Sequence, residues 1–158
     1  MPDENLIVRE DDLSGEPTRD LVRFHLAGMF AHSPADQVHA LDWSGLLAPG
    51  ITVWSAWRGE AIAGIGALRM LDDGTAELKS MRTHPDHLRS GVAAAILEHI
   101  IGVALRRDLA RLSLETGSGE AFEPSLALYR RRGFVDGAAF SDYEQTDFNQ
   151  FLHLDLQR

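Results

Sequence analysis

The chain has 158 residues, of which 44% are hydrophobic and 25% charged, and this suffices for one domain over residues 1–158 with a proper core. It contains no cysteine, which excludes a disulfide framework, thiolate chemistry and a cysteine-ligated metal. The formal net charge of −9 argues against duplex nucleic acid or an anionic membrane as the main partner.

The first half of the chain predicts a short strand, two helical segments and three consecutive strands. Apolar residues at helical spacing indicate a helix over Thr18–Phe30, and Ser33-Pro34 begins a second helical turn or short helix that reaches Leu41. The turn Asp72–Gly74 is a strong hairpin signal. The predicted strands begin at Ile7-Val8 and then cover Ile51–Trp57, Ala61–Met70 and Thr75–Thr83.

The second half alternates helices with strands. A long apolar helix is predicted over Gly91–Arg107, and a second over Pro124–Arg132, with proline near its start and glycine just past its end. Strands are expected at Arg111–Thr116, Phe134-Val135 and Phe151–Leu156. The order is β-α-α-β-β-β-α-β-α-β-β, an antiparallel meander followed by a βαβ crossover, which predicts an α+β domain with a mixed sheet.

An anion-binding helix start is the most informative local feature. The strand that ends at Thr83 is followed by a turn, and Arg89-Ser90-Gly91 then opens the long alanine-rich helix. The first amides of a helix have no partner within it, and they carry a partial positive charge. Because Gly91 permits close approach and Arg89 adds a cation, a phosphate-bearing ligand fits this position.

Several rival motifs are absent or badly placed. No GxxxxGK[ST] sequence occurs, which argues against a P-loop nucleotide site. Gly64-Ile65-Gly66 lies within the meander and not before a helix, so a dinucleotide-binding fingerprint fails. His84 and His87 flank a Pro-Asp turn, for which a solvated turn is the better interpretation than a metal site.

Two ordered motifs resemble those of the GNAT N-acetyltransferases. Ala76–Pro85 followed by Leu88–Ala93 looks like the acetyl-CoA motif of that family, and Ser125–Phe134 looks like the helix and strand that close the same site. The resemblance implies the GNAT acyl-CoA N-acyltransferase fold, a twisted and mostly antiparallel sheet flanked by about four helices. One position departs from the family pattern, because Leu88 stands where Gln or Arg is usual.

The resemblance assigns donor-binding roles to residues of this chain. The backbone of Met81, Arg82 and Thr83 would pair with the pantetheine arm of acetyl-CoA, and one of these amides would polarise the thioester carbonyl. The pyrophosphate would lie on the amides from Arg89 to Ala94. The complete set implied for the donor, with no metal, is Met81, Arg82, Thr83, Arg89, Ser90, Gly91, Val92, Ala93, Ala94, Glu115 and Leu126.

Catalytic roles follow from the same resemblance and from side-chain chemistry. Tyr129 occupies the family's acid position and would protonate the leaving thiolate. Glu77 is the candidate base for the amine, with Glu115 as a second candidate near the end of the next strand. On a regular strand Glu77, Lys79 and Met81 share one face, so Glu77 and Lys79 can equally form only a surface ion pair.

The acceptor site is expected near the first helical segments and their loop. His25, Met29, Ser33 and His39 are the candidate substrate residues there, although a histidine on an apolar face is more often structural. Asp142-Tyr143 and Phe148 lie in a loop that would wall the same pocket.

The sequence therefore predicts an acetyl-CoA-dependent N-acetyltransferase that acts on the primary amine of a small molecule. The alternatives are a non-catalytic acyl-CoA sensor of the same fold and an enzyme for protein N-termini or lysines. The acidic segment Met1–Asn5 lacks a secretory pattern and no apolar run is long enough for a bilayer, so we expect a cytoplasmic protein. Pairing of two copies through Phe151–Leu156 is left open as a hypothesis.

Overall fold

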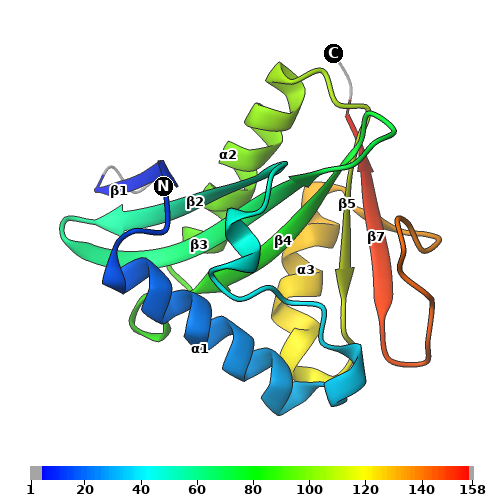
Figure 1. Cartoon of the computed structure of the whole chain (residues 1–158), viewed down its shortest axis with the longest axis horizontal. Coiled ribbons are helices and arrows are strands. Elements are labelled where there is room, and N and C mark those ends of the chain that lie inside the picture. The colour runs from blue at the N-terminus through cyan, green and yellow to red at the C-terminus, as the bar shows by residue number, and fades with distance from the viewer. Residues whose placement is uncertain (1–4, 157–158) are drawn as a thin grey trace.

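A computed structural model describes residues 5–156 of the chain. Seven strands form one sheet in the order β1-β2-β3-β4-β5-β7-β6 (Figure 1). The strands are β1 (Leu6–Asp11), β2 (Ile51–Arg58), β3 (Ala61–Met70), β4 (Ala76–Thr83), β5 (Arg111–Thr116), β6 (Val135–Asp136) and β7 (Gln150–Asp155). The helices are α1 (Glu16–His32), α2 (Val92–Arg106) and α3 (Glu123–Arg132), with short 3-10 turns at Ala35–Gln37, Gly45–Leu47, Pro85–His87 and Glu120–Phe122.

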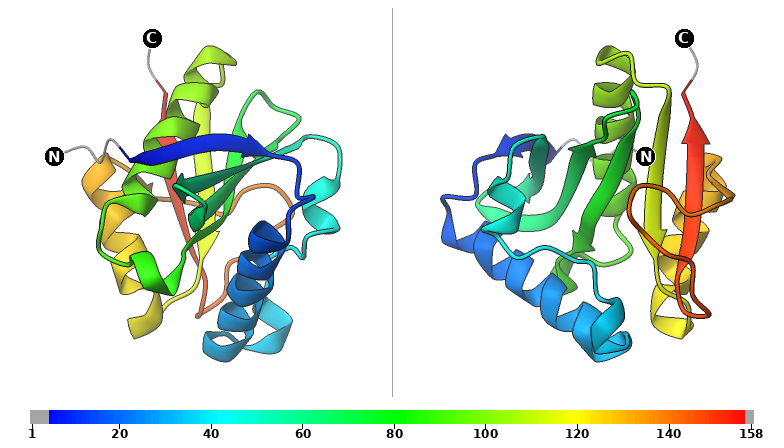
Figure 2. Two further views of the ribbon diagram at one scale, coloured as in Figure 1. Left: turned by 90° about the vertical axis from the view of Figure 1, so that its left-hand side faces the viewer. Right: turned by 45° about the vertical axis from the view of Figure 1, so that its right-hand side comes forward.

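All strand pairs are antiparallel except β4 and β5, which are joined by α2 and run parallel. Helix α1 covers one face of the sheet, and α2 and α3 cover the other (Figures 1 and 2). This confirms the predicted fold class and the alternation of the second half.

Each face of the sheet has its own buried cluster. On the α1 face, Leu21 and Val22 pack with Ile65. On the α2 face, Ile96 and Ile100 of α2 pack with strand residues such as Leu68, Leu78 and Leu112, together with Leu126 and Tyr129 of α3. The four-residue spacing of Val92, Ile96, Ile100 and Ala104 places one apolar stripe of α2 on the sheet, which explains why this segment forms a helix here.

Two expectations about secondary structure are corrected. The helical turn or short helix expected from Ser33 to Leu41 is a 3-10 turn over Ala35–Gln37, so within residues 5–156 three α-helices flank the sheet and not about four. Pro34 begins the turn, as expected. Further along, the His39 carbonyl accepts a hydrogen bond from Lys79 Nζ in place of one from a helical backbone amide. Strand β7 is not an open edge, because it lies between β5 and β6.

No helix in the described part of the chain is long and apolar enough to cross a membrane.

A β-bulge in β4 changes which side chains share a face. Lys79 pairs with Ala67, but Arg82 pairs with Ile65, so β4 carries one residue more than β3 over this stretch. Ser80 in between has a φ of 56°, a left-handed conformation. The prediction that Met81 shares a face with Glu77 and Lys79 is therefore wrong.

The bulge moves Met81 to the α2 face and Arg82 to the α1 face. The sulfur of Met81 lies in the same gap as Ile96 and Ile100 of α2, beside Gly66. The guanidinium of Arg82 lies against α1.

Gly66 allows α2 to approach the sheet closely. A Cβ added there would lie 2.7 Å from both Ile96 Cγ2 and the Met81 sulfur. We predict that Gly66→Ala lowers the free energy of unfolding by about 1–3 kcal/mol through overpacking. Urea denaturation measures this change.

Gly102→Ala is the matched control. Its Cβ would meet only the mobile end of Arg106, 3.3 Å away, and alanine favours a helix interior by about 1 kcal/mol over glycine. Equal losses of stability in the two variants would contradict the overpacking argument.

Candidate active site

Strands β4 and β5 separate soon after they meet. They pair only through Ala76 with Leu112 and Glu77 with Ser113, although each strand continues for several residues. The backbone of β4 from Leu78 onward thus has no partner strand on the β5 side. Since backbone amides and carbonyls require hydrogen-bond partners, this opening suits an extended ligand that lies between the strands.

The turn between β4 and α2 is held from β2 by one arginine. Arg58 Nη1 donates to Ser90 Oγ at 3.1 Å, and Arg58 Nη2 donates to the Ser90 carbonyl at 2.9 Å. Arg58 Nη1 also lies 2.9 Å from His87 Nδ1. This contact makes His87 part of the hydrogen-bonded structure of the turn.

The N-terminus of α2 presents unpaired amides beside the opening. The first helical hydrogen bond runs from Ala95 N to the Gly91 carbonyl at 3.0 Å, so the amides of Gly91, Val92, Ala93 and Ala94 have no partner within the helix. Arg89 and Gly91 both adopt positive φ, at 57° and 84°, which turns the chain into the helix. The predicted phosphate-binding residues are thus brought together, while the Leu88 side chain is 61% exposed.

Tyr129 lies on α3 and is 6% exposed. Its ring packs against Phe134 at 5.6 Å between centroids, and its hydroxyl makes no hydrogen bond within residues 5–156. Burial raises the pKa of this phenol, an effect that the charge of Arg82 opposes. The hydroxyl therefore keeps its proton at neutral pH and has no competing acceptor. Leu126, one turn earlier, is fully buried in the core.

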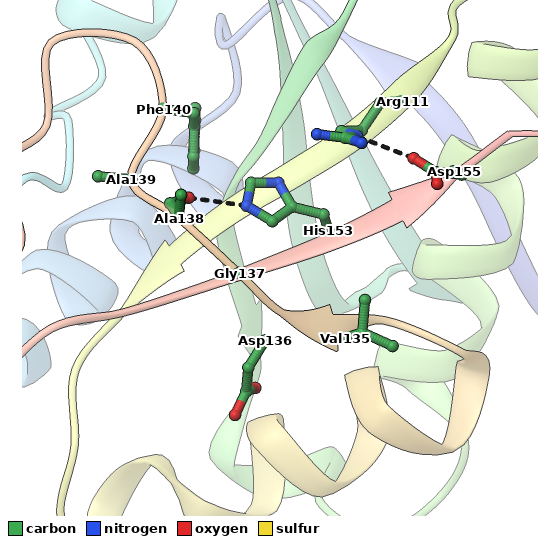
Figure 3. Close-up of a pocket in the computed structure, with 9 residues that line it drawn as sticks. All are labelled: Arg111, Val135, Asp136, Gly137, Ala138, Ala139, Phe140, His153 and Asp155. Carbon is green, nitrogen blue, oxygen red and sulfur yellow. Dashed lines mark hydrogen bonds and ion pairs between the residues drawn. The ribbon is translucent and has the colours of Figure 1, made fainter.

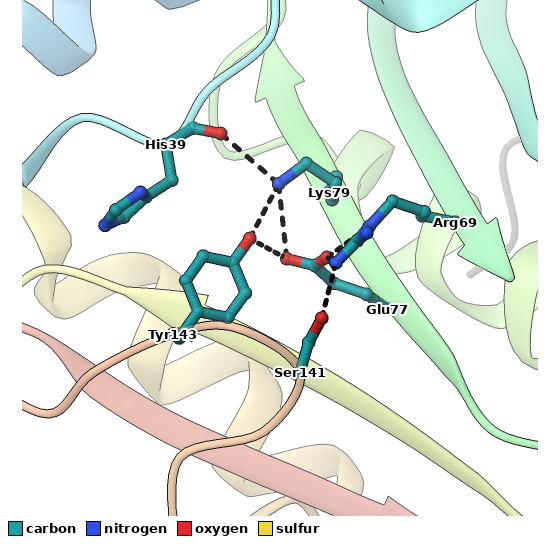
Figure 4. Close-up of polar contacts among 6 residues, drawn as sticks. All are labelled: His39, Arg69, Glu77, Lys79, Ser141 and Tyr143. Carbon is teal, nitrogen blue, oxygen red and sulfur yellow. Dashed lines mark hydrogen bonds and ion pairs between the residues drawn. The ribbon is translucent and has the colours of Figure 1, made fainter. Parts of the chain in front are cut away.

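Glu77 is enclosed by cations and a phenol (Figure 4). Its Oε1 accepts from Arg69 Nε at 2.8 Å, and its Oε2 accepts from Lys79 Nζ at 3.2 Å and from the Tyr143 hydroxyl. The Glu77 side chain is 2% exposed, so the expected pair with Lys79 exists but is buried. Both carboxylate oxygens of Glu77 thus already accept hydrogen bonds from neighbouring side chains.

The same network fixes two loops over β4, because Lys79 Nζ donates to the His39 carbonyl at 3.3 Å and further contacts reach the loop between β6 and β7. Lys79 Nζ contacts the Tyr143 hydroxyl at 2.9 Å, and Arg69 Nη2 donates to Ser141 Oγ at 3.2 Å. Sequence reasoning missed Arg69 as a site residue, and it placed Tyr143 only in a pocket wall. The one available signal was the pairing of positions 69 and 77 across the hairpin.

Glu115 has a different environment from Glu77. It lies on β5 where that strand has left β4, and it is partly exposed. Burial raises its pKa to about 7; the charge of Lys79 and a hydrogen bond with Asn149 lower it, and Glu77 raises it. A carboxyl with this pKa exchanges protons near neutral pH.

The four residues predicted for the acceptor site lie in different environments. His25 is 6% exposed, and its Nδ1 accepts from Arg82 Nε at 2.9 Å. Met29 packs against the core of the α2 face. Ser33 follows α1, and its buried hydroxyl has no hydrogen-bond partner among the described residues. The ring of His39 meets that of Tyr143 edge-on at 5.0 Å.

A separate hollow of about 310 Å³ lies beyond β5 and β7 (Figure 3). Its lining includes the exposed ion pair of Arg111 with Asp155 and the ring of His153, whose Nε2 lies 2.8 Å from the Ala138 carbonyl. None of its lining residues comes from β4, α2 or α3. It is therefore distinct from the site described above.

The mixed sheet, with its two parallel strands parting beside the free end of a helix, has the acyl-CoA N-acyltransferase fold. The chain belongs to the GNAT acetyltransferase family, whose sequence profile matches residues 17–134. This match confirms the family resemblance that the two sequence motifs indicated. It identifies the chain as an N-acetyltransferase.

Relatives of known sequence support this assignment. The uncharacterized N-acetyltransferase YedL of Escherichia coli (strain K12) is 48% identical over 149 residues, which cover 94% of each chain. The uncharacterized N-acetyltransferase YsnE of Bacillus subtilis (strain 168) is 46% identical over 145 residues, 92% of this chain and 96% of its own.

Solved structures show the same fold at low identity. A putative acyl-CoA N-acyltransferase from Klebsiella pneumoniae superposes with a TM-score of 0.78 at 20% identity, over 96% of this chain and 98% of its own. A Bacillus subtilis acetyltransferase in complex with CoA superposes with a TM-score of 0.65 at 17% identity, over 96% and 99%.

We predict that Glu77→Gln mainly costs stability. Removing the charge leaves Arg69 and Lys79 without their carboxylate, and the loss of one partner of a buried ion pair costs about 3–5 kcal/mol. Thermal denaturation measures the loss, and the pH profile of the remaining activity should keep its shape. A variant as stable as the parent that had lost turnover would instead make Glu77 the base.

Proposed function

We propose that the chain transfers an acetyl group from acetyl-CoA to the primary amine of a small molecule by direct attack in a ternary complex. The observation that carries the proposal is the parting of β4 and β5 beside the free amides of α2. The proposal places the reaction in the cytoplasm, with neither nucleic acid nor a membrane as partner. The net charge of −9 supports the exclusion of polyanions.

The residues of the opening fit this donor. Four unpaired amides at the start of α2, from Gly91 to Ala94, suit the diphosphate, and Arg89 adds a cation nearby. The unpaired edge of β4 at Met81–Thr83 suits the amide groups of pantetheine. Acetyl-CoA supplies the activated acetyl group at this site.

The proton transfers are assigned to two side chains. Glu115 takes the proton that the amine loses as its nitrogen bonds to the acetyl carbon. As the carbon–sulfur bond breaks, the sulfur receives the proton of the Tyr129 hydroxyl. The pKa of about 7 for Glu115 supports the first role, and the unbonded, protonated phenol of Tyr129 supports the second.

A sensor that binds acyl-CoA without turnover is the competing function, and the exposed Leu88 in the phosphate turn is the feature that favours it. An assay of thiol release over a panel of amines separates the two. Tight CoA binding without thiol release on any amine, peptide or protein would favour the sensor.

We predict that Tyr129→Phe lowers kcat by about 100-fold, because general acid catalysis contributes roughly 10²–10⁴. Stability should change little, since this hydroxyl makes no hydrogen bond within the described residues. Steady-state kinetics and thermal denaturation measure the two effects. Full turnover of the variant across pH would contradict the assignment.

Tyr143→Phe is the matched control for stability. It removes a hydroxyl that bonds Glu77 and Lys79, so we expect a loss of about 1–3 kcal/mol there.

We predict that kcat/KM rises with pH through a midpoint near 7, because Glu115 accepts a proton only when ionised. Activity is thus low below that pKa and high above it. The assay should use an acceptor whose amine has a pKa well away from 7. Glu115→Gln should lower the plateau by at least tenfold and abolish this transition, within the roughly 10²–10⁴ that a base contributes.

Glu98→Gln removes an exposed carboxylate that pairs with Arg132 on the surface and serves as the control. A transition near 7 that persists in Glu115→Gln would exclude Glu115 as the base.

A further inference from the structure

Arg82 is a partly buried cation without an anion. Its Nε donates to His25 Nδ1 at 2.9 Å, and within residues 5–156 it forms no ion pair with any carboxylate. Burial lowers the pKa of Arg82, which reflects the cost of holding the charge there. Buried charges are ordinarily paired, so this guanidinium is an exception that calls for a ligand.

The two neighbouring cations of β3 and β4 on this face are satisfied. Lys79 and Arg69 share the carboxylate of Glu77, and Lys79 has two further oxygen acceptors in His39 and Tyr143. Arg82 is therefore not part of a general excess of basic residues. The chain as a whole carries a charge of −9, so an anionic ligand needs a local cation of this kind.

His25 holds the guanidinium in one orientation. Burial lowers the pKa of His25 to about 3, with the charges of Arg82 and Lys79 acting in the same direction, so the imidazole is neutral near pH 7. Its Nδ1 accepts from Arg82, which leaves both Nη atoms of the guanidinium for another acceptor.

Helix α1 leaves room for the guanidinium at Gly28. A Cβ there would lie 3.0 Å from Arg82 Nη2, and the Phe24 ring flanks the group with its centroid 5.6 Å from Arg82 Cζ. The group is thus fixed before any ligand arrives.

The position of Arg82 points to the acceptor and not to the donor. The bulge at Ser80 turns its side chain onto the α1 face, whereas α2, which presents the free amides, packs on the other face. The charge of Arg82 also acts on the pKa of Tyr129, so the guanidinium lies within electrostatic range of the proposed acid.

We propose that Arg82, oriented by His25, binds a carboxylate of the acceptor, so that the acceptor is an amine that also carries a carboxylate, an amino acid. This inference rests on the proposed function. A guanidinium binds a carboxylate through two parallel hydrogen bonds, and Arg82 retains the two Nη atoms needed for them.

The first test compares L-amino acids with their carboxamides as acceptors. The ratio of kcat/KM between acid and amide should fall at least tenfold in Arg82→Gln, through KM, and less in Arg82→Lys, which keeps the charge. Arg107→Gln, which alters an arginine bound to Thr52 and Met70, should leave the ratio unchanged. An unchanged ratio in Arg82→Gln would overturn the inference.

The second test needs no turnover and detects binding directly. In the CoA-bound protein, the ¹⁵Nε–¹H NMR signal of Arg82 should shift saturably with propionate and stay unmoved with propionamide. A signal that ignores both probes overturns the inference, even where amines without a carboxylate release thiol and uphold the proposed function. A response to propionate with no thiol release on any amine upholds carboxylate binding and refutes the proposed function.

Discussion

The site depends on the short pairing between β4 and β5. After Glu77 and Ser113 the two strands have no further ladder bonds, so the β4 backbone is left with donors and acceptors that must be satisfied from outside the sheet. The free amides of α2 begin a few residues beyond the same strand. A ligand that offers both peptide-like groups and phosphates meets both needs at once.

The bulge at Ser80 distributes the side chains of β4 between the two faces. It sends Met81 toward α2, where it fills space beside Gly66, and Arg82 toward α1 and His25. One extra residue therefore separates the backbone surface proposed for the donor from the charge proposed for the acceptor.

The two acidic residues near the opening, Glu77 and Glu115, differ in the side chains that surround them. Glu77 is held by Arg69 of β3, by Lys79 of β4 and by Tyr143 of the loop between β6 and β7. Glu115 lies on the strand that has diverged, and burial without a comparable set of cations raises its pKa to about 7. The same type of side chain is thus enclosed by cations on one strand and has a raised pKa on the next.

The sequence by itself determined the family, the alternation of elements and the turn that leads into α2, because those depend on local order: a strand, then Arg89–Gly91, then a helix. It could not determine the roles of Glu77, Glu115 and Arg82. Those roles depend on a single inserted residue in β4 and on loops distant in the chain, and a shift of one residue reverses every side chain that follows it. Only the tertiary structure brings Tyr143 to Glu77 and His25 to Arg82, and these contacts decide which charges are satisfied and which remain available for a ligand.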